Sequence, residues 1–231
     1  MKRRLTRLAA ASLVAVVCAG TVAIAAALAV VPPAGTPDLP SMVIQPSDLA
    51  PGAPSASGGY VKPGKGLLAA YNSSFRDVTT TAGVRLAGVE TSVALASSSA
   101  NAHAYFKDLR AVYGSKKGRL LIAAEIAKGA GAGAGLKRSD FSFARVRAVG
   151  VGDQSALEPF TMHIKGVKLA ADLLVLRAGD VLANLTVVGL GGQLTPRVAT
   201  ALGATVAAHI AAVLAGSTGA SGATGATGAT G

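Results

Sequence analysis

The alternation of apolar and polar residues is most regular in the C-terminal half of the chain. Three runs in which every second residue is apolar, 160–164, 167–175 and 181–187, are separated by Lys165-Gly166 and by Gly179-Asp180. Strict alternation is typical of half-buried β-strands, and short links that contain glycine are typical of hairpin turns. The pattern therefore predicts an antiparallel meander of three strands.

Two further strands are expected upstream, over 71–78 and 84–95. Within the second of them the alternation changes phase by one residue at Ala87-Gly88. A one-residue slip at a glycine is typical of a β-bulge, which places an extra residue in one strand of a pair. A turn between two shorter strands is the alternative interpretation.

Three segments repeat apolar residues at spacings of three and four, which predicts helices over about 98–113, 117–128 and 195–214. The residues expected to face the core are Ala102, Tyr105, Phe106, Leu109, Val112 and Tyr113 in the first, Leu120, Leu121, Ala124 and Ala127 in the second, and Val198, Leu202, Val206, Ile210 and Val213 or Leu214 in the third.

Residues at the ends of these segments favour the same helices. Ser98 or Ser99 is suited to cap the first, because a serine hydroxyl accepts a hydrogen bond from a free backbone N–H of the first turn. Gly129 is expected to end the second. Thr195 caps the third, and Pro196 stands at its first position, where the missing N–H costs nothing.

The order of elements is strand, strand, helix, helix, three strands and helix. It predicts a single α+β domain over 37–215, with an antiparallel sheet of about five strands and three helices packed mainly on one face. Residues 41–58 are expected to pack on this domain. The run of alternating glycine and alanine over 129–135 predicts a flexible loop, because it offers little side chain to pack.

Residues 1–36 have the pattern of a membrane signal followed by a spacer. Four basic residues in the first seven precede an uncharged run, Leu8–Val31. The length of the run favours a helix that stays in the membrane, whereas Ala27-Leu28-Ala29 is a cleavage pattern for a signal peptide. In either case the basic N-terminus predicts that the domain lies outside the cytoplasm, as a single-pass membrane protein or secreted after cleavage at Ala29.

Glycine occupies every third position of the low-complexity tail, 216–231. This period is typical of collagen, in which only glycine fits at the axis of the triple helix. The five complete triplets contain no proline to favour the extended conformation. A disordered tail on a monomer is therefore expected, and a collagen-like trimer is the alternative.

Composition excludes several classes of site. The chain has no tryptophan and 4% aromatic residues. Because it has only one cysteine and three histidines, a disulfide framework and a cysteine-type zinc site are excluded. No nucleophile or dinucleotide motif is present, so we predict no catalytic residue, no cofactor, no metal and no nucleic-acid partner. Asp172 and Lys168, which share one side of a predicted strand, are interpreted as a solvated charge pair.

The net charge of +11 suggests a different kind of partner. Basic residues cluster at Lys116, Lys117 and Arg119, at Lys137-Arg138, and at Arg145 and Arg147. A basic surface close to a membrane attracts anionic lipid or anionic wall polymer. Lys116, Lys117 and Arg119 are therefore candidate contacts for an anion, and an ordinary solvated face is the alternative.

Three short motifs, 42–49, 149–153 and 175–181, precede the last helix in an arrangement that resembles small secreted or membrane-anchored α+β domains of actinobacterial envelope proteins, including extracellular sensor modules. The resemblance implies an envelope location. We therefore expect a non-catalytic extracytoplasmic binding or sensor-like domain. A structural surface protein that oligomerises through its tail, and an envelope enzyme with an unrecognised site, are the alternatives.

Overall fold

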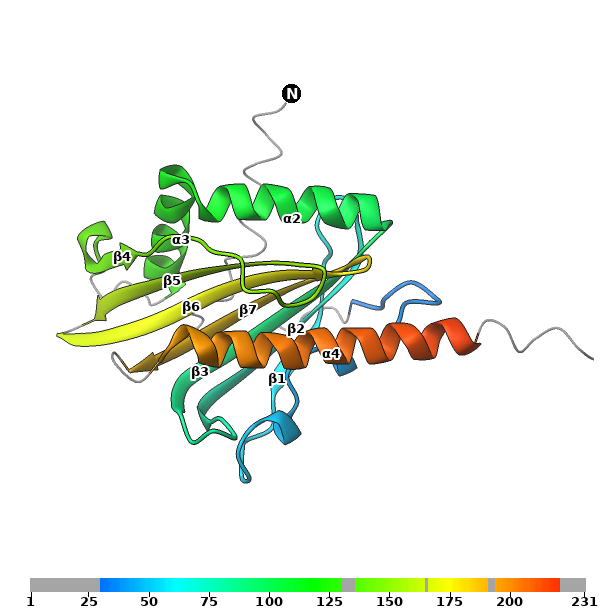
Figure 1. Cartoon of the computed structure of the whole chain (residues 1–231), viewed down its shortest axis with the longest axis horizontal. Coiled ribbons are helices and arrows are strands. Elements are labelled where there is room, and N and C mark those ends of the chain that lie inside the picture. The colour runs from blue at the N-terminus through cyan, green and yellow to red at the C-terminus, as the bar shows by residue number, and fades with distance from the viewer. Residues whose placement is uncertain (1–29, 130–135, 165, 191–193, 221–231) are drawn as a thin grey trace, which may run out of the picture.

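The computed structural model describes residues 30–129, 136–164, 166–190 and 194–220, and its centre is one antiparallel sheet (Figure 1). Seven strands follow the order β1-β2-β3-β7-β6-β5-β4. The α+β class is confirmed. The strands are β1 Ser57–Val61, β2 Leu67–Thr79, β3 Arg85–Ala96, β4 Phe141–Phe143, β5 Gln154–Ile164, β6 Val167–Ala178 and β7 Val181–Leu190.

The meander and the bulge predicted from the alternation are both confirmed. β5 pairs with β6 and β6 with β7, each in antiparallel register. β3 runs without interruption, and its register against β7 shifts between Leu86 and Gly88. The change of phase therefore marks a bulge within one strand rather than a turn between two.

The prediction of about five strands is wrong, because the sheet also includes β1 and β4 at its two edges. β1 has consecutive glycines and is partly exposed, and the alternation of β4 covers only three residues, which is too short to indicate a strand. Gly58 lies so close to β2 that an added Cβ would stand 2.3 Å from the carbonyl oxygen of Asn72. β1 therefore lies close enough to β2 to pair with it, although its own sequence has almost no hydrophobic pattern.

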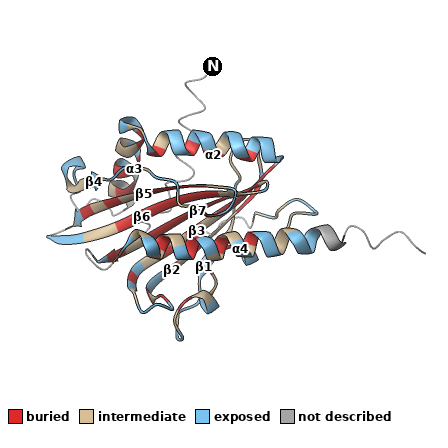
Figure 2. Cartoon of the chain, in the orientation of Figure 1, coloured by how far each residue is buried: buried red, intermediate tan, exposed pale blue. Residues whose placement is uncertain are grey.

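The prediction that the helices pack mainly on one face is also wrong. α2 Ser99–Tyr113 and α3 Lys116–Gly129 cover one face of the sheet, and α4 Pro196–Ala220 covers the other (Figures 1 and 2). The reason lies in β6, where the run 173–176 is apolar at every position and buried on both sides. Leu174 packs in the core cluster of α4, whereas Leu173 packs in that of α2 and α3. A strand covered on both faces loses its alternation.

α2 matches its prediction. The Ser98 hydroxyl accepts a hydrogen bond from the backbone N–H of Asn101 at 3.2 Å, and the helix ends at Tyr113. Its buried residues, Ala102, Phe106, Leu109 and Tyr113, belong to the stripe expected from the sequence.

α3 is rotated relative to the prediction. Ile122, Ala123 and Ile126 are buried, whereas Leu121 is 39% exposed and Ala124 is exposed. The segment 120–124 is apolar all round, so periodicity alone leaves the buried side open. The side chain of Arg119, which reaches into the sheet, selects the rotation that is observed.

The segment before the sheet packs against α4. Two short 3-10 helices, Leu39–Met42 and Pro46–Asp48, bring Leu39, Met42 and Ile44 into the same core as α4, where each is at most 1% exposed. A ring nitrogen of His209 in α4 lies 3.0 Å from the carbonyl oxygen of Val43. This contact joins the start of the domain to its last helix.

Some predicted segments fall outside the described residues, namely most of the membrane segment, the glycine loop 130–135 and the tail from 221. Residues 216–220 of the expected tail belong to α4. Among the described residues, the helix Pro196–Ser217 is long and apolar enough to cross a membrane, with a mean hydropathy of 1.9. Its stripe of Ala199, Leu202, Val206 and Ile210 is buried on the sheet.

Candidate functional site

Two of the three predicted anion contacts, Lys116 and Arg119, meet in one pocket. We name it the α3 pocket; it has a volume of about 400 Å³ and is lined by Lys116, Arg119, Leu120, Ala123, Arg138, Phe141 and Phe143. Lys117, the third predicted contact, is exposed and does not line it. The pocket therefore joins the first turn of α3 to β4 and the 3-10 turn before it.

The first turn of α3 concentrates positive charge. The Ser115 hydroxyl accepts a hydrogen bond from the backbone N–H of Gly118 at 2.9 Å, which caps the helix. The turn holds no acidic residue, although carboxylates are the side chains that the positive end of a helix dipole favours. Lys116, Lys117 and Arg119 stand there instead, at some cost to helix stability. Their charges add to the field of the helix end.

A close contact between α2 and α3 determines where this turn lies. A Cβ added to Gly118 would stand 1.8 Å from the carbonyl oxygen of Val112 in α2, so only glycine fits. The two helices can therefore follow each other almost directly. This junction places Lys116 and Arg119 above the edge of the sheet formed by β4 and β5.

Arg119 is held by contacts on several sides. Its Nε donates to Glu158 Oε1 at 2.6 Å, and one terminal nitrogen donates to the carbonyl oxygen of Ala144 at 2.5 Å. Its guanidinium carbon lies 5.9 Å from the centre of the Phe143 ring, which is within the range of a cation–π contact. Arg119 therefore has a fixed position, and much of its charge is engaged by the protein itself.

Glu158 of β5 is the buried partner of Arg119. Its side chain is inaccessible to solvent, and its Oε2 has no hydrogen-bond partner in the part of the chain that is described. Burial raises the pKa of Glu158 to about 6, although the hydrogen bond and the charge of Arg119 act in the opposite direction. Arg119 therefore serves mainly as the counter-ion of Glu158. Lys116 and Arg138 are the cations of the pocket that remain available to a ligand.

Aromatic rings form the apolar side of the pocket. Phe143 stacks on Phe160 of β5 with ring centres 5.2 Å apart, and Phe141 stacks on Phe143 at 6.4 Å. No carboxylate lines the α3 pocket among the described residues. The pocket can therefore receive an anionic group between Lys116 and Arg138, with an apolar surface beside it.

Sequence reasoning noted Arg138 as a basic residue but did not place it with Lys116, and it missed Phe141 and Phe143. These residues lie about twenty positions after α3 begins, and only the pairing of β4 with β5 brings them back. The alternation Phe141-Ser142-Phe143, separated by two residues from Lys137-Arg138, was the available signal. Other basic residues of the predicted clusters, Lys117, Lys137, Arg145 and Arg147, are exposed and lie outside the pocket.

The remaining titratable residues show no catalytic arrangement in the described ranges. No group of three His, Cys, Asp or Glu that could hold a metal is found there. His103 lies 2.9 Å from Gln154 Oε1, and His209 is a contact between α4 and the preceding segment. The interpretation of Asp172 as solvated is wrong: it is 3% exposed, because β6 is covered on both faces. Burial raises its pKa to about 6, against the charge of Arg147.

The fold and the pocket together define an α+β domain with one basic, aromatic-lined pocket at the edge of its sheet. No family model matches the chain, and no curated protein matches it. Among solved structures, the chain is similar to the extracellular domain of PknH from Mycobacterium tuberculosis, with 13% sequence identity and a TM-score of 0.43. The similarity covers 74% of this chain and 91% of that chain.

Proposed function

We propose that this chain is a non-catalytic, sensor-like binding domain of the cell envelope that holds an anionic group in the α3 pocket. The observation that carries the proposal is the meeting of Lys116 and Arg138, from separate elements, above a wall of stacked phenylalanines. No carboxylate lines the pocket in the described residues, so these two cations keep a net positive field there.

The source of the anionic group follows from the N-terminal segment. A domain that begins a few residues after a membrane helix stays close to the outer leaflet and the cell wall. Both carry phosphate groups, on anionic lipids and on wall polymers. Each basic residue near such a surface contributes ~1 kcal/mol, so two cations in one pocket suffice for retention but not for tight binding. The full chain acts as a monomer in this proposal.

The anion-binding role is tested by retention of the full chain, in neutral detergent, on beads that carry phosphatidylglycerol or a phosphate-bearing wall polymer. Lys116→Ser and Arg138→Ser are each expected to weaken retention about fivefold, the equivalent of ~1 kcal/mol. Lys117→Ser is the matched control, because it removes the same charge from the same helix turn outside the pocket. The control is expected to lose about twofold or less, since it affects only the general surface charge.

Equal losses of retention in all three variants would mean that the beads attract the general surface charge and not the α3 pocket, which would contradict the proposal. A difference between the two bead types identifies the source of the anion. Retention of every variant at the wild-type level would show that neither Lys116 nor Arg138 binds an anion, and it would also contradict the proposal.

The proposed location has its own test. Intact cells treated with an added protease, after their wall is made permeable, are expected to lose the domain while a cytoplasmic marker survives. The physical reason is that the four basic residues of the N-terminus stay in the cytoplasm and leave the following domain outside. Degradation only after lysis would place the domain in the cytoplasm and exclude the envelope function.

A further inference from the structure

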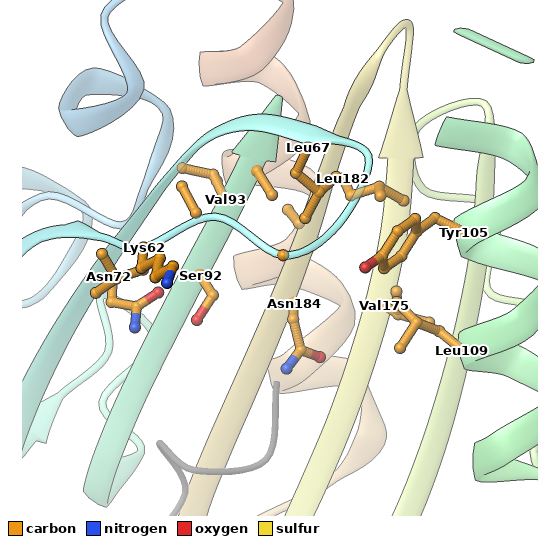
Figure 3. A pocket seen from close by; sticks show the side chains of 15 residues that line it. Lys62, Leu67, Asn72, Ser92, Val93, Tyr105, Leu109, Val175, Leu182 and Asn184 are labelled. Carbon is orange, nitrogen blue, oxygen red and sulfur yellow. The ribbon is translucent and has the colours of Figure 1, made fainter. Parts of the chain in front are cut away.

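A second pocket lies on the face of the sheet that α2 covers, away from the α3 pocket. We name it the sheet pocket; it has a volume of about 50 Å³ and lies between the β1–β2 connection, α2 and five neighbouring strands (Figure 3). Its lining comprises Val61, Lys62, Gly64, Leu67, Ala70, Asn72, Ser92, Val93, Ala94, Tyr105, Leu109, Val175, Leu182, Ala183 and Asn184.

Three polar side chains form one row across the bottom of the sheet pocket. Asn72 of β2 pairs in register with Ser92 of β3, and Ser92 pairs with Asn184 of β7. Paired residues of adjacent strands point to the same face. All three therefore present amide or hydroxyl groups to the same space.

Among the described residues, one printed contact joins a side chain of this row to another residue. The Oδ1 atom of Asn184 accepts a hydrogen bond from the hydroxyl of Tyr113 at 3.2 Å, which orients the amide. The amide nitrogen of Asn184 has no hydrogen-bond acceptor among the described residues and is not among their buried unpartnered atoms, so it is open to the space of the pocket. Amide and hydroxyl groups that face a small pocket can donate hydrogen bonds to a ligand that carries an acceptor there.

The rest of the lining separates into an apolar part and a cation. Figure 3 shows Tyr105, Leu109 and Val175 at one end, and Lys62 at the other end beside Asn72 and Ser92. In the described part of the chain Lys62 forms no ion pair, and no carboxylate lines the pocket. A ligand that fits is apolar at one end and negatively charged at the other.

A carboxyl group that faces the same side of the sheet, Glu90, does not repel such a ligand. Glu90 lies two residues before Ser92 on β3 and faces the same side of the sheet, opposite Ser74 and Thr186. Burial raises the pKa of Glu90 to about 9, so the side chain is protonated and neutral at pH 7.

We propose that the sheet pocket binds a short-chain carboxylate, with its alkyl chain against Leu109, Val175 and Leu182 and its carboxylate beside Lys62 and the Asn72–Ser92–Asn184 row. The size of the ligand follows from the volume of the pocket. A water molecule occupies roughly 10–15 Å³ on the same scale, so this pocket encloses about three to five non-hydrogen atoms, and the rest of the ligand lies in its open mouth. This site is independent of the α3 pocket and of its ligand.

The experiment measures binding of alkanoates to the full chain in lipid nanodiscs by saturation-transfer NMR, with empty nanodiscs as the blank. Hexanoate is expected to bind about tenfold more tightly than hexan-1-ol, because only the carboxylate meets Lys62 and the amides with charge-assisted hydrogen bonds. Hexylammonium is expected not to bind. Decanoate is expected to bind no more tightly than hexanoate after subtraction of the blank, because the pocket ends at α2.

The variants separate the site from general surface effects. Lys62→Gln is expected to weaken hexanoate about tenfold, whereas Lys65→Gln, in the same connection but outside the lining, leaves it unchanged. Asn72→Asp is expected to abolish binding by repulsion, and circular dichroism serves to check that the variant, changed at a half-buried position, is folded. Leu67→Trp provides a second test by filling the pocket from the loop.

Two results overturn the proposal. One is equal binding of hexanoate and hexan-1-ol, which would mean an apolar cavity with no recognition of charge. The other is a failure of the site itself, seen either as wild-type affinity in folded Lys62→Gln and Leu67→Trp or as no binding of any alkanoate to the wild-type chain. Loss of the α3-pocket function in Lys116→Ser is expected to leave hexanoate binding intact.

Discussion

Replacing Glu90 with glutamine is expected to stabilise the domain at neutral pH by about 3 kcal/mol. Burial raises the pKa of Glu90 from 4.5 to about 9, and its Oε1 is inaccessible with no hydrogen-bond partner among the described residues. The folded state therefore keeps a proton that the unfolded state releases near pH 4.5. Glutamine has the shape of the protonated acid but holds no titrating proton.

The sign of the pH dependence follows from the same shift. Because the folded chain binds more protons than the unfolded chain between pH 4.5 and pH 9, the contribution of Glu90 is fully present below pH 4.5 and is lost as pH rises through 9. Glu158 and Asp172, whose pKa values are raised to about 6, act in the same direction only up to about pH 6. Between pH 6 and pH 9 the loss of stability belongs to Glu90.

Denaturant unfolding at pH 5, 7 and 9 measures this effect. The wild-type chain is expected to lose stability steadily across this range, and Glu90→Gln is expected to remove the loss above pH 6. Asp108→Asn is a suitable control, because it neutralises an exposed carboxylate on α2. An unchanged slope above pH 6 in Glu90→Gln would show that Glu90 is solvated in the folded chain.

Replacing Arg119 with methionine is expected to lower the free energy of unfolding by about 3–5 kcal/mol at pH 8. The substitution leaves Glu158, which is inaccessible to solvent, without the cation that bonds its Oε1 at 2.6 Å. At pH 5 the loss is expected to shrink, because Glu158 without Arg119 has a pKa above its present value of about 6 and becomes protonated. A buried neutral acid needs no counter-ion.

A second substitution separates the ion pair from the packing of the arginine stem. Adding Glu158→Gln to Arg119→Met is expected to restore most of the stability at pH 8. Lys116→Met removes a cation from the same pocket without touching Glu158 and is expected to be nearly neutral. A loss that is equal at pH 5 and pH 8, or that the double variant does not repair, would assign the effect to packing alone.

This role of Arg119 also determines which residues test the function. Arg119 was a candidate anion contact on sequence grounds, because it lies in a basic cluster. In the structure its guanidinium bonds Glu158 and the carbonyl oxygen of Ala144, so its replacement disturbs α3 itself. Lys116 and Arg138 have no such duty among the described contacts. Substitutions of Lys116 and Arg138 therefore test binding without disturbing the fold.

Much of the fold could be predicted because local patterns carry it. The meander, the bulge near Gly88 and the capped helix after Ser98 each depend on residues within one or two turns or strands of each other. β1 and β4 could not be predicted, because an edge strand with glycines or only three residues depends on its neighbour for pairing. Asp172 was misjudged for a related reason. It lies on the same face of β6 as Leu174, which is the face that α4 covers.

The candidate sites could be predicted only in part. Charge alone pointed to Lys116 and Arg119, since a basic cluster is visible along the chain. Arg138 and the phenylalanines join them through the pairing of β4 with β5, which no local pattern specifies. The polar row of the sheet pocket had no sequence signal, because Asn72, Ser92 and Asn184 come from three strands far apart in the chain.

The sequence by itself determined most of the periodic elements and the basic first turn of α3, because each is a property of neighbouring residues. The tertiary structure alone decided which face each helix covers, how α3 is rotated and which side chains meet. The physical reason is that β6 is apolar on both sides, so either face could receive α4. The side of α3 that faces the sheet was set by one ion pair between Arg119 and the buried Glu158, 39 residues apart.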